Sequence, residues 1–388
     1  MNDKTPKSAE LYEVLAARAP ITVLSVERAM GELRRGRPVV VRGGGGHAVL
    51  ALAAEAMGPE SLQQLHDIAG SAPTLAITAR RAAVLGLAES AGKIAIVSGL
   101  GGLSADEIAA LANPLVEAGV TPALRDRLSV TVRTEPGHDC ASASVSLSKL
   151  ARLLPAAVTA QIGDVGDIMA WANRHDFLSV DTGDVFQYEG AASRNLKRVG
   201  EARVPISDAH DTRIVAFRPS DGGREHLAII VGQPGPADPV LVRLHSECFT
   251  GDLLGSLRCD CGDQLQGALA EIKTAGAGVL LYLAQEGRGI GLINKLRAYE
   301  LQDLGFDTMD ANEQLGFDAD ERVYMPAARM LKLLGFSKVR LMTNNPDKLA
   351  ALSRYGVDVV ERVAHAFPAN QHNEFYLQTK ASRSGHQF

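Results

Sequence analysis

The sequence is poor in cysteine and in aromatic residues. Only four cysteines occur among 388 residues, and aromatic side chains make up 5% of the chain. So few cysteines exclude a disulfide-stapled scaffold and favour a reducing compartment. No apolar run reaches the length that a membrane-spanning helix needs, and the polar N-terminus has no apolar signal-peptide core behind it. We therefore expect a soluble protein of the cytoplasm that has no membrane as a partner.

The chain also lacks an excess of positive charge. It has 40 Lys and Arg against 45 Asp and Glu, which gives a formal net charge of −5. Because no global basic field attracts nucleic acid, we expect none as a partner. With 46% hydrophobic and 22% charged residues, the composition is that of an ordinary globular protein. The length allows two or three domains.

Three of the four cysteines are concentrated in one stretch. Cys248, Cys259 and Cys261 follow the spacing C-x10-C-x-C between residues 243 and 261. Thiolates gathered this closely suit a borderline cation, above all Zn²⁺. A structural zinc normally takes four protein ligands and a catalytic zinc three, so three cysteines without an obvious fourth partner favour a site open to water. The alternative is that the three thiols are small buried side chains of a core.

Short strands alternate with helices along the first half, which indicates an α/β (α+β) fold. A polar arm covers residues 1–20, with a short helix at 9–18. We expect helices at 26–33, 47–57, 104–112 and 163–175. We expect strands at 37–41, 74–78, 93–97, 128–132 and 177–180, and a last short element at 184–188.

Residues 189–200 are small and polar, which is typical of a linker. The sequence therefore predicts an arm at 1–20, a first domain at 21–190 and a second domain at 191–388, each domain a mixed sheet with helices packed on it. In the second domain we expect strands at 213–217, 225–231, 239–244, 278–284, 339–343 and 357–362, and helices at 263–275 and 292–304.

The first half resembles 3,4-dihydroxy-2-butanone 4-phosphate synthase, in the segments 29–41 and 168–180. That family has an acidic loop after its first strand, whose carboxylates bind Mg²⁺. Here the place is taken by Arg42-Gly-Gly-Gly-Gly-His47, which offers a hard cation no carboxylate. Four bare glycines can cradle phosphate, but a flexible turn is the better interpretation.

We therefore interpret the first domain as a degenerate relative without synthase activity, retained for dimerisation, stability or regulation. Its isolated His47, His138 and Cys140 are interpreted as structural residues rather than metal ligands.

A glycine-rich turn at 285–291 lies between an apolar strand and a helix in the second half. Such a turn lets backbone N–H groups and the helix N-terminus approach an anion. Arg288 adds a planar fork suited to phosphate, and Glu286 offers a carboxylate that can accept paired donors, as on a guanine edge. Thr343 ends an expected strand and Lys348 follows it, at the carboxyl end where open α/β sheets usually bind ligands.

From residue 197 to residue 385 the chain closely resembles GTP cyclohydrolase II. The resemblance is carried by many motifs in the family's order: His245-Ser-Glu-Cys, Arg258-Cys-Asp-Cys-Gly, Gln285-Glu-Gly-Arg-Gly-Ile-Gly-Leu, Asn294-Lys-Leu-Arg-Ala-Tyr, Gln314-Leu-Gly-Phe, Asp320-Glu-Arg and Thr343-Asn-Asn-Pro. It implies a homodimer that uses one Zn²⁺ per chain, and Mg²⁺ with the triphosphate, to open the imidazole ring of GTP. Formate and pyrophosphate leave, and the product is 2,5-diamino-6-ribosylamino-4(3H)-pyrimidinone 5′-phosphate, made for riboflavin synthesis.

The resemblance also implies roles for single residues. Cys248, Cys259 and Cys261 correspond to the zinc ligands. The positions that contact GTP in the family are occupied here by Arg243, Glu247, Gln264, Glu286, Arg288, Thr308, Thr343 and Lys348. Tyr299 falls at a catalytic position, Asp320 at that of the general base, and Arg322 at that of a residue proposed to attack the α-phosphate. A guanidinium is a poor nucleophile, so stabilisation of the leaving pyrophosphate is the alternative role of Arg322.

Two other functions remain open at this point. A paralogous zinc hydrolase of pyrimidine catabolism would keep the metal site on the same scaffold and change the base pocket. A nucleotide-binding regulator would bind GTP and release no product; the retention of Tyr299, Asp320, Arg322 and the three cysteines disfavours it. Formate and pyrophosphate release from GTP distinguishes these possibilities.

Overall fold

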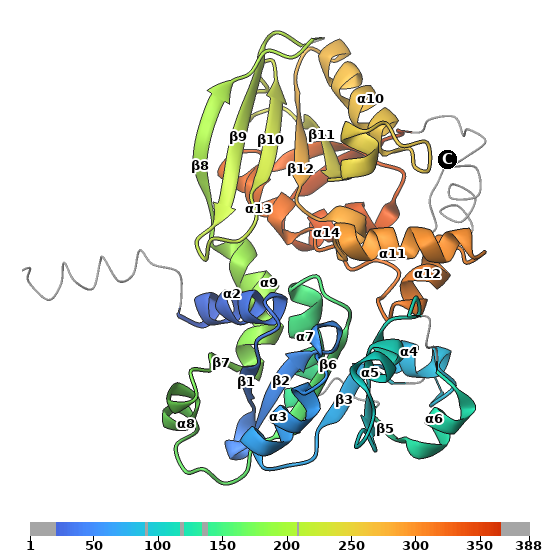
Figure 1. Cartoon of the computed structure of the whole chain (residues 1–388). Helices are drawn as coiled ribbons and strands as arrows, with labels where there is room; N and C mark the ends of the chain where they lie inside the picture. The colour runs from blue at the N-terminus through green and yellow to red at the C-terminus, as the bar shows by residue number, and fades with distance from the viewer. Residues whose placement is uncertain (1–20, 90–91, 117–119, 134–138, 208, 366–388) are drawn as a thin grey trace, which may run out of the picture.

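The protein contains two seven-stranded sheets, one in each half of the chain (Figure 1). This computed structural model describes residues 21–89, 92–116, 120–133, 139–207 and 209–365. The expected arm at 1–20 and His138 lie outside the described residues. Both sheets are mixed and carry helices, so the expected fold class is confirmed.

The first sheet has the strand order β5-β4-β3-β6-β2-β1-β7, and only the pair β1–β7 is parallel. Its strands are β1 (Val39–Arg42), β2 (Ala48–Ala53), β3 (Thr74–Thr78), β4 (Ile94–Ser98), β5 (Ser129–Arg133), β6 (Ala156–Gln161) and β7 (Ser179–Asp181). The helices of this half are α2 (Ile21–Arg34), α3 (Ser61–Ala69), α4 (Ala79–Val84), α5 (Ala105–Ala112), α6 (Pro122–Arg127), α7 (Cys140–Leu150), α8 (Ile168–Arg174) and α9 (Thr182–Arg194). Two short 3₁₀ turns, η1 (Gly44–Gly46) and η2 (Ala54–Ala56), flank β2.

Both faces of the first sheet are buried, and this explains why the sequence of β2 suggests a helix. Every residue of β2 is buried. Leu50 and Leu52 belong to the core on one face, whereas Val49 and Ala51 belong to the core under α2 and α7 on the other. A strand buried on both faces reads as a continuous apolar run without alternation, which resembles a buried helix. The helix expected at 47–57 is therefore wrong.

The linker expected at 189–200 is also wrong. Helix α9 continues to Arg194, and strand β8 begins at Leu196, so the chain passes from one half to the other without a flexible segment. The short element expected at 184–188 is the middle of α9, and the helix expected at 163–175 is confined to Ile168–Arg174. The five strands expected in this half are present within two residues of their expected bounds.

The second sheet has the order β14-β13-β11-β12-β10-β9-β8. Its strands are β8 (Leu196–Arg203), β9 (Thr212–Pro219), β10 (His226–Val231), β11 (Val240–Ser246), β12 (Gly278–Leu283), β13 (Lys338–Met342) and β14 (Asp358–Val363). The helical elements are the π-turn η3 (Phe249–Leu253), α10 (Cys261–Thr274), the 3₁₀ turn η4 (Glu286–Gly289), α11 (Leu292–Asp303), α12 (Thr308–Gln314), α13 (Met325–Leu333) and α14 (Pro346–Arg354).

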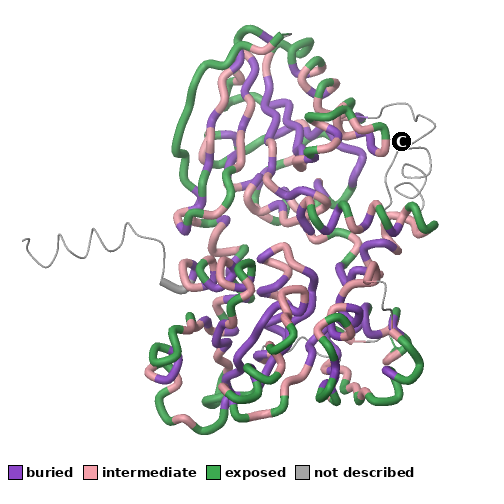
Figure 2. Tube along the Cα trace, in the orientation of Figure 1, coloured by how far each residue is buried: buried purple, intermediate pink, exposed green. Residues whose placement is uncertain are grey.

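Four neighbouring strands of this sheet, β14, β13, β11 and β12, run parallel, and the other three are antiparallel. Helix α10 covers one face, whereas α13 and α14 cover the other. Figure 2 shows the buried residues following the strands of both sheets. The carboxyl ends of the parallel strands therefore open onto the loops that carry the cysteines and the glycine-rich turn, as expected for an open α/β sheet.

One hydrophobic cluster contains residues of both halves. The cluster on one face of the first sheet includes Leu315 and Phe317 of the second half, and it also takes in Ile290, Ala298 and Leu301. Polar contacts cross the same boundary: Arg81 donates to the carbonyl of Gln314, and Thr78 donates to that of Gly316. Among the described residues, no helix combines the length and apolar character needed to cross a bilayer.

Candidate active site

Three thiols converge where β11 ends and α10 begins. Cys248 follows β11, Cys259 lies in the loop after η3, and Cys261 is the first residue of α10. The Sγ atoms of Cys248 and Cys259 are 3.7 Å apart, and all three Sγ atoms lie within 4.8 Å of one another. No other group of three or more His, Cys, Asp or Glu side chains within the described ranges comes together in this way.

The geometry of this cluster fits zinc. Two thiolates at about 2.3 Å from a tetrahedral zinc lie about 3.8 Å apart, which matches the spacing of Cys248 and Cys259. Hydrogen bonds with the two other cysteines, together with the nearby Lys295, hold the pKa of Cys248 far below its usual range. The same contact with Cys248 raises the pKa of Cys259, so the protonation of the thiols is coupled. Three protein ligands leave a fourth position for water or substrate.

The π-turn η3 shapes the cluster from its backbone. The N–H of Gly251 points at Cys248 Sγ across 3.3 Å. A Cβ at Gly251 would lie 2.8 Å from Cys259 Sγ and 3.0 Å from Cys248 Sγ. Asp252 fixes the turn, because its carboxylate accepts from the N–H of Cys248 at 3.0 Å and from Tyr282 Oη at 2.8 Å. Because a Cβ at residue 251 would lie this close to the sulfur atoms, only glycine allows the backbone to approach the thiols in this way.

Asp252 also holds His245 in place. The His245 Nε2 atom lies 3.0 Å from both carboxylate oxygens of Asp252, and its ring stacks on that of Tyr282. His245 is almost fully buried, and burial lowers its pKa despite the carboxylate. This buried group fixes the end of β11, from which Cys248 follows.

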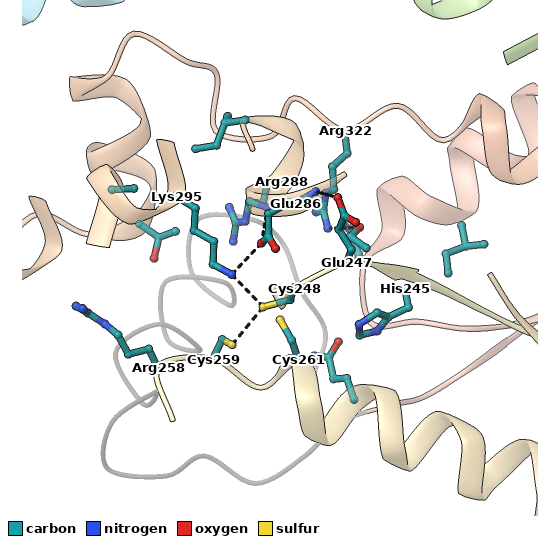
Figure 3. Close-up of a pocket in the computed structure, with 18 of the residues that line it drawn as sticks. His245, Glu247, Cys248, Arg258, Cys259, Cys261, Glu286, Arg288, Lys295 and Arg322 are labelled. Carbon is teal, nitrogen blue, oxygen red and sulfur yellow. Dashed lines mark hydrogen bonds and ion pairs between the residues drawn. The ribbon is translucent and has the colours of Figure 1, made fainter. Parts of the chain in front are cut away.

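Lys295 lies between the thiols and the glycine-rich turn (Figure 3). Its Nζ atom is 3.0 Å from Cys248 Sγ, and 2.9 Å from both Glu286 Oε1 and Thr250 Oγ1. Burial alone would lower the pKa of Lys295. The hydrogen bonds to Glu286 and Cys248 outweigh burial and raise it, so the side chain remains a cation.

The glycine-rich turn packs closely against its surroundings. Arg288 has a φ of 59° and Gly287 a φ of 63°, which place two successive residues in the left-handed region. Glu286 is buried, and its carboxylate accepts from the N–H groups of Phe249 and Gly287 as well as from Lys295. In this conformation Glu286 joins the turn to η3, and Arg288 donates to the carbonyl of Ala319.

Basic side chains form another part of the pocket wall. Arg243 on β11 donates to the carbonyl of Met342, and burial lowers its pKa to about 10. Lys348 on α14 is buried and donates to the carbonyl of Leu244 at 2.9 Å. The Arg322 guanidinium and the Lys348 ammonium both lie over the ring of Tyr324, 5.7 Å and 5.8 Å from its centroid. An anionic substrate is the complement of such a wall.

Asp320 and Arg322 form an ion pair in the loop before α13. Arg322 Nε donates to Asp320 Oδ1 at 2.8 Å, and the backbone N–H of Arg322 donates to the same atom. Partial burial raises the pKa of Asp320, but the Arg322 guanidinium outweighs it and holds the pKa below its usual value. The carboxylate is therefore ionised at neutral pH and can accept a proton.

Tyr299 lies on α11, one helical turn after Lys295. The Arg258 guanidinium is 4.6 Å from the centroid of its ring, and Lys295 Nζ is 5.6 Å from it. Burial raises the pKa of Tyr299 to about 12, so the phenol remains protonated and can donate.

One pocket gathers nearly all the residues predicted from sequence. Thirteen of the fourteen line it, and Asp320 contacts it through Arg322. The lining residues among them are Arg243, Glu247, Cys248, Cys259, Cys261, Gln264, Glu286, Arg288, Tyr299, Thr308, Arg322, Thr343 and Lys348. Their common location is observed; their individual roles stay predictions.

Several other lining residues have no role that the sequence predicts. These are His245, Arg258, Lys295, Gln302, Asn312, Asn344, Asn345 and His365. Lys295 had a usable signal, since it precedes Tyr299 by four residues on a helix and so shares its face. The position of His365, which follows the last strand, had no such signal because it depends on the pairing of β13 with β14.

Comparison with known proteins gives a consistent result. The sequence model of the family GTP cyclohydrolase II matches residues 197–364. A GTP cyclohydrolase-2 from Azospirillum brasilense is 56% identical over 365 residues, which cover 94% of each chain. A GTP cyclohydrolase-2 from Xylella fastidiosa is 39% identical over 367 residues, covering 93% of this chain and 86% of that one. A riboflavin biosynthesis protein RibBA of Synechocystis is 46% identical over 259 residues, which are 64% of this chain and 46% of that protein.

The fold and the site define an enzyme in which a three-thiol cluster able to hold a metal faces arginine and lysine side chains. The length and sequence identity of these matches identify the family: the chain belongs to the GTP cyclohydrolase II family of riboflavin biosynthesis. The matches to the GTP cyclohydrolase-2 proteins of A. brasilense and X. fastidiosa extend through the first half as well as the second.

Similar solved structures have lower sequence identity to this chain. RibBX of A. baumannii, a two-domain 3,4-dihydroxy-2-butanone 4-phosphate synthase, aligns with 88% of this chain and 99% of its own, at 19% identity and a TM-score of 0.36. A 3,4-dihydroxy-2-butanone 4-phosphate synthase of Candida albicans aligns with 42% of this chain and 96% of its own, at 18% identity and a TM-score of 0.34.

Proposed function

We propose that this chain is a zinc-dependent GTP cyclohydrolase II, which hydrolyses GTP to 2,5-diamino-6-ribosylamino-4(3H)-pyrimidinone 5′-phosphate, formate and pyrophosphate. The observation that carries the proposal is one pocket in which the three thiols face Tyr299 and a set of basic side chains. The thiols suit a catalytic metal, and the cations suit a triphosphate.

Cys248, Cys259 and Cys261 would hold the zinc. When bound, zinc supplies the Lewis acidity that activates water at neutral pH. Tyr299, whose phenol stays protonated, orients the purine or the attacking water by donating a hydrogen bond. Asp320, kept ionised by Arg322, accepts the proton that water loses as the imidazole ring opens and formate is released.

The basic residues of the pocket act on the triphosphate. Arg243, Arg288 and Lys348 neutralise its charge, and Mg²⁺ would accompany it, held mainly by the phosphate oxygens. Arg322 is paired with Asp320 and therefore cationic. This supports a role in stabilising charge on the leaving pyrophosphate rather than attacking the α-phosphate. Glu247, Gln264, Glu286, Thr308 and Thr343 are the remaining residues proposed to contact GTP.

A turnover assay tests the proposal. Purified full-length chain with Zn²⁺ and Mg²⁺ should release formate and pyrophosphate from GTP, and Cys259→Ser should lose both bound zinc and at least about 99% of the activity. Cys140→Ser, which replaces the only cysteine outside the cluster, serves as the matched control and should keep both. Full activity and full zinc content in Cys259→Ser would refute the proposal. GTP binding without product would favour the regulator, and a pyrimidine product from another substrate would favour the paralogue.

We also propose that the first half has no 3,4-dihydroxy-2-butanone 4-phosphate synthase activity. The turn at Gly43–Gly46 offers no carboxylate, and the neighbouring Asp181 is ion-paired with Arg42 at 2.6 Å. Conversion of ribulose 5-phosphate by the full chain with Mg²⁺ would contradict this. The homodimer and the cytoplasmic location belong to the same proposal, and light scattering of the purified chain tests the dimer.

A further inference from the structure

The last turn of helix α7, in the first half, reaches the catalytic loops of the second half. Arg152 follows α7 with a φ of 61°, a left-handed conformation that a non-glycine residue seldom adopts. Its side chain extends to the second half. Arg152 Nη2 donates to the carbonyl of Ala284 at 2.7 Å, where β12 passes into the glycine-rich turn.

The other contacts of Arg152 surround the same turn. Its backbone carbonyl accepts from Asn294 Nδ2 at 3.0 Å, and Asn294 is fully buried at the start of α11. Its aliphatic chain lies so close to Gly291 that a Cβ there would be 3.0 Å from Arg152 Cδ. Its Nη1 atom is 3.8 Å from Glu247 Oε1. Arg152 thus contacts the residues at both ends of the turn that carries Glu286 and Arg288.

Lys149, in the last turn of α7, contacts the other catalytic loop. Its Nζ atom donates to Glu321 Oε1 at 2.6 Å, and Glu321 lies between Asp320 and Arg322. The N–H of Glu321 donates to the carbonyl of Arg288 at 3.0 Å, so the two loops are also bonded to each other. A Cβ at Gly289 would lie 2.9 Å from the backbone of Glu321, which shows how closely the loops pack.

We propose that Arg152 and Lys149 are positioning residues for the active site: the first half braces the glycine-rich turn through Arg152 and the loop of Asp320 and Arg322 through Lys149. The proposal rests on the proposed function for the roles of the two loops, and it gives the first half a task that needs no active site of its own. The printed contacts of both residues are with these two loops and with Glu247, so the brace acts on the loops rather than on the metal ligands themselves.

The two contacts should have different kinetic effects. Loss of the Arg152 brace loosens the turn that binds substrate, so Arg152→Met should raise KM for GTP about tenfold. Loss of the Lys149 brace loosens the loop that moves protons and charge, so Lys149→Met should lower kcat about tenfold with little change in KM. Displacements of about 1 Å at such distances cost up to 10²-fold in rate. Zinc content should match the wild type in both variants.

Arg37→Met is the matched control. Arg37 is a half-exposed arginine of the same half. It pairs with Glu32 at 2.7 Å and with Asp176 at 2.9 Å, and neither partner belongs to a catalytic loop. Its loss removes two ion pairs without touching either catalytic loop, so kcat and KM should stay within about twofold of the wild type. Equal changes in Arg37→Met and Arg152→Met would overturn the proposal.

Amide hydrogen exchange gives a readout that does not need turnover. Residues 285–291 should exchange faster in Arg152→Met, and residues 318–322 faster in Lys149→Met, whereas Arg37→Met should leave both unchanged. Unchanged exchange in both loops would overturn the brace even if activity fell. If the wild-type chain does not turn over GTP, the proposed function fails, and exchange alone then decides on the brace.

A charge-reversal pair at residues 149 and 321 distinguishes loss of the ion pair from misfolding. Lys149→Glu places two carboxylates side by side, and the double variant Lys149→Glu with Glu321→Lys restores an ion pair in reverse. The double variant should recover most of the kcat that Lys149→Glu loses. A double variant that folds and binds zinc but recovers no kcat over Lys149→Glu would contradict the role of this pair.

Discussion

Lys295 places one cation where a thiol, a carboxylate and a hydroxyl converge. Three thiolates around a divalent zinc would carry a net negative charge, and Glu286 adds another next to them. Lys295 Nζ is within 3.0 Å of both Cys248 Sγ and Glu286 Oε1, and its side chain is only 10% exposed. A buried charge without a partner is strongly unfavourable, so each of these groups depends on the others.

Lys295→Met should weaken zinc binding and destabilise the fold. Breaking a buried ion pair by removing one partner costs about 3–5 kcal/mol, because the remaining carboxylate and thiolate lose their compensating charge. We expect faster loss of zinc to a chelator, measured by a colorimetric zinc indicator, and a lower free energy of unfolding in urea. Lys273→Met, on the exposed side of α10, is the control and should change neither. Unchanged chelation kinetics in Lys295→Met would show that the lysine does not serve the thiols.

His226 makes stability depend on pH. Its Nδ1 atom accepts from the N–H of Ala284 at 3.0 Å, and burial, followed by the charges of Arg152 and Arg224, lowers its pKa to about 4. The unfolded chain protonates His226 near pH 6.5, whereas the folded chain protonates it only near pH 4. The contribution of neutral His226 to the free energy of unfolding is therefore complete above pH 6.5 and is lost as the pH falls toward 4. It amounts to at most about 3 kcal/mol.

His226→Asn should therefore flatten the fall in stability between pH 6.5 and pH 4, since the amide oxygen can accept the same N–H and does not titrate. Urea unfolding at a series of pH values measures the slope. The slope should decrease without vanishing, because burial also lowers the pKa of His365 to about 4. An identical slope in the variant would rule out His226 as a source of the pH dependence.

The sequence could place a residue in the pocket where a motif names it, but not where only the fold brings it in; the roles of the named residues stay predictions. The cysteines, Tyr299, Asp320 and Arg322 lie in motifs whose spacing and chemistry can be recognised. Lys295 lies in one of those motifs too, but its role follows from contacts with Cys248 and Glu286, which are 47 and 9 residues away along the chain. No local pattern specifies such a contact.

The π-turn η3 is the element on which the metal cluster depends. It runs from Phe249 to Leu253 and turns the chain sharply between Cys248 and Cys259. Irregular helical turns of this kind are uncommon and often mark functional sites. Here the turn brings the backbone of Gly251 against all three cysteines, with distances from a virtual Cβ of 2.8 to 3.0 Å.

Gly251→Ala should disrupt the cluster by its single added carbon. Overpacking a dense site typically costs about 1–3 kcal/mol, and here the displaced atoms are the metal ligands themselves. We expect the purified variant to contain less zinc than the wild type, as measured by atomic emission. Gly235→Ala, where a Cβ would meet nothing within 4 Å, should keep its zinc. Full zinc occupancy in Gly251→Ala would mean that the turn can relax without moving the thiols.

Whole elements were predicted best where one face is polar or a cap is explicit. Helix α5 begins after Ser104, whose side chain forms a capping box with Glu107, and its expected bounds were correct within one residue. Strand β2 was mistaken for a helix because both of its faces are buried. Residues 189–200 look like a linker by composition, yet tertiary packing makes them the end of α9 and the start of β8, where Leu196 is buried.

At the scale of the whole molecule, the sequence indicated two halves but not that they pack against each other through a common hydrophobic cluster. Phe317 and Leu315 follow α12 in the second half, yet they are buried in the same cluster as Leu75 and Ile77 of β3. Apolar periodicity shows that a residue is buried, not which sheet it is buried against. The buried arginine Arg81 adds to the union, since it donates to carbonyls of Leu111 in its own half and of Gln314 in the other. The boundary between halves is therefore a core rather than a hinge.

A shared core predicts that the two halves unfold together. Trp171, the only tryptophan, belongs to this core and reports on the first half through its fluorescence, whereas zinc release reports on the second. We expect the two signals to coincide in urea, because separating the halves would expose the apolar side chains that they share. Phe317→Ala should shift both curves equally, by about 3–5 kcal/mol of unfolding free energy. If zinc were released at a lower urea concentration than the one that changes Trp171 fluorescence, the halves would be independent units, and the brace at Arg152 and Lys149 would join two separately stable bodies.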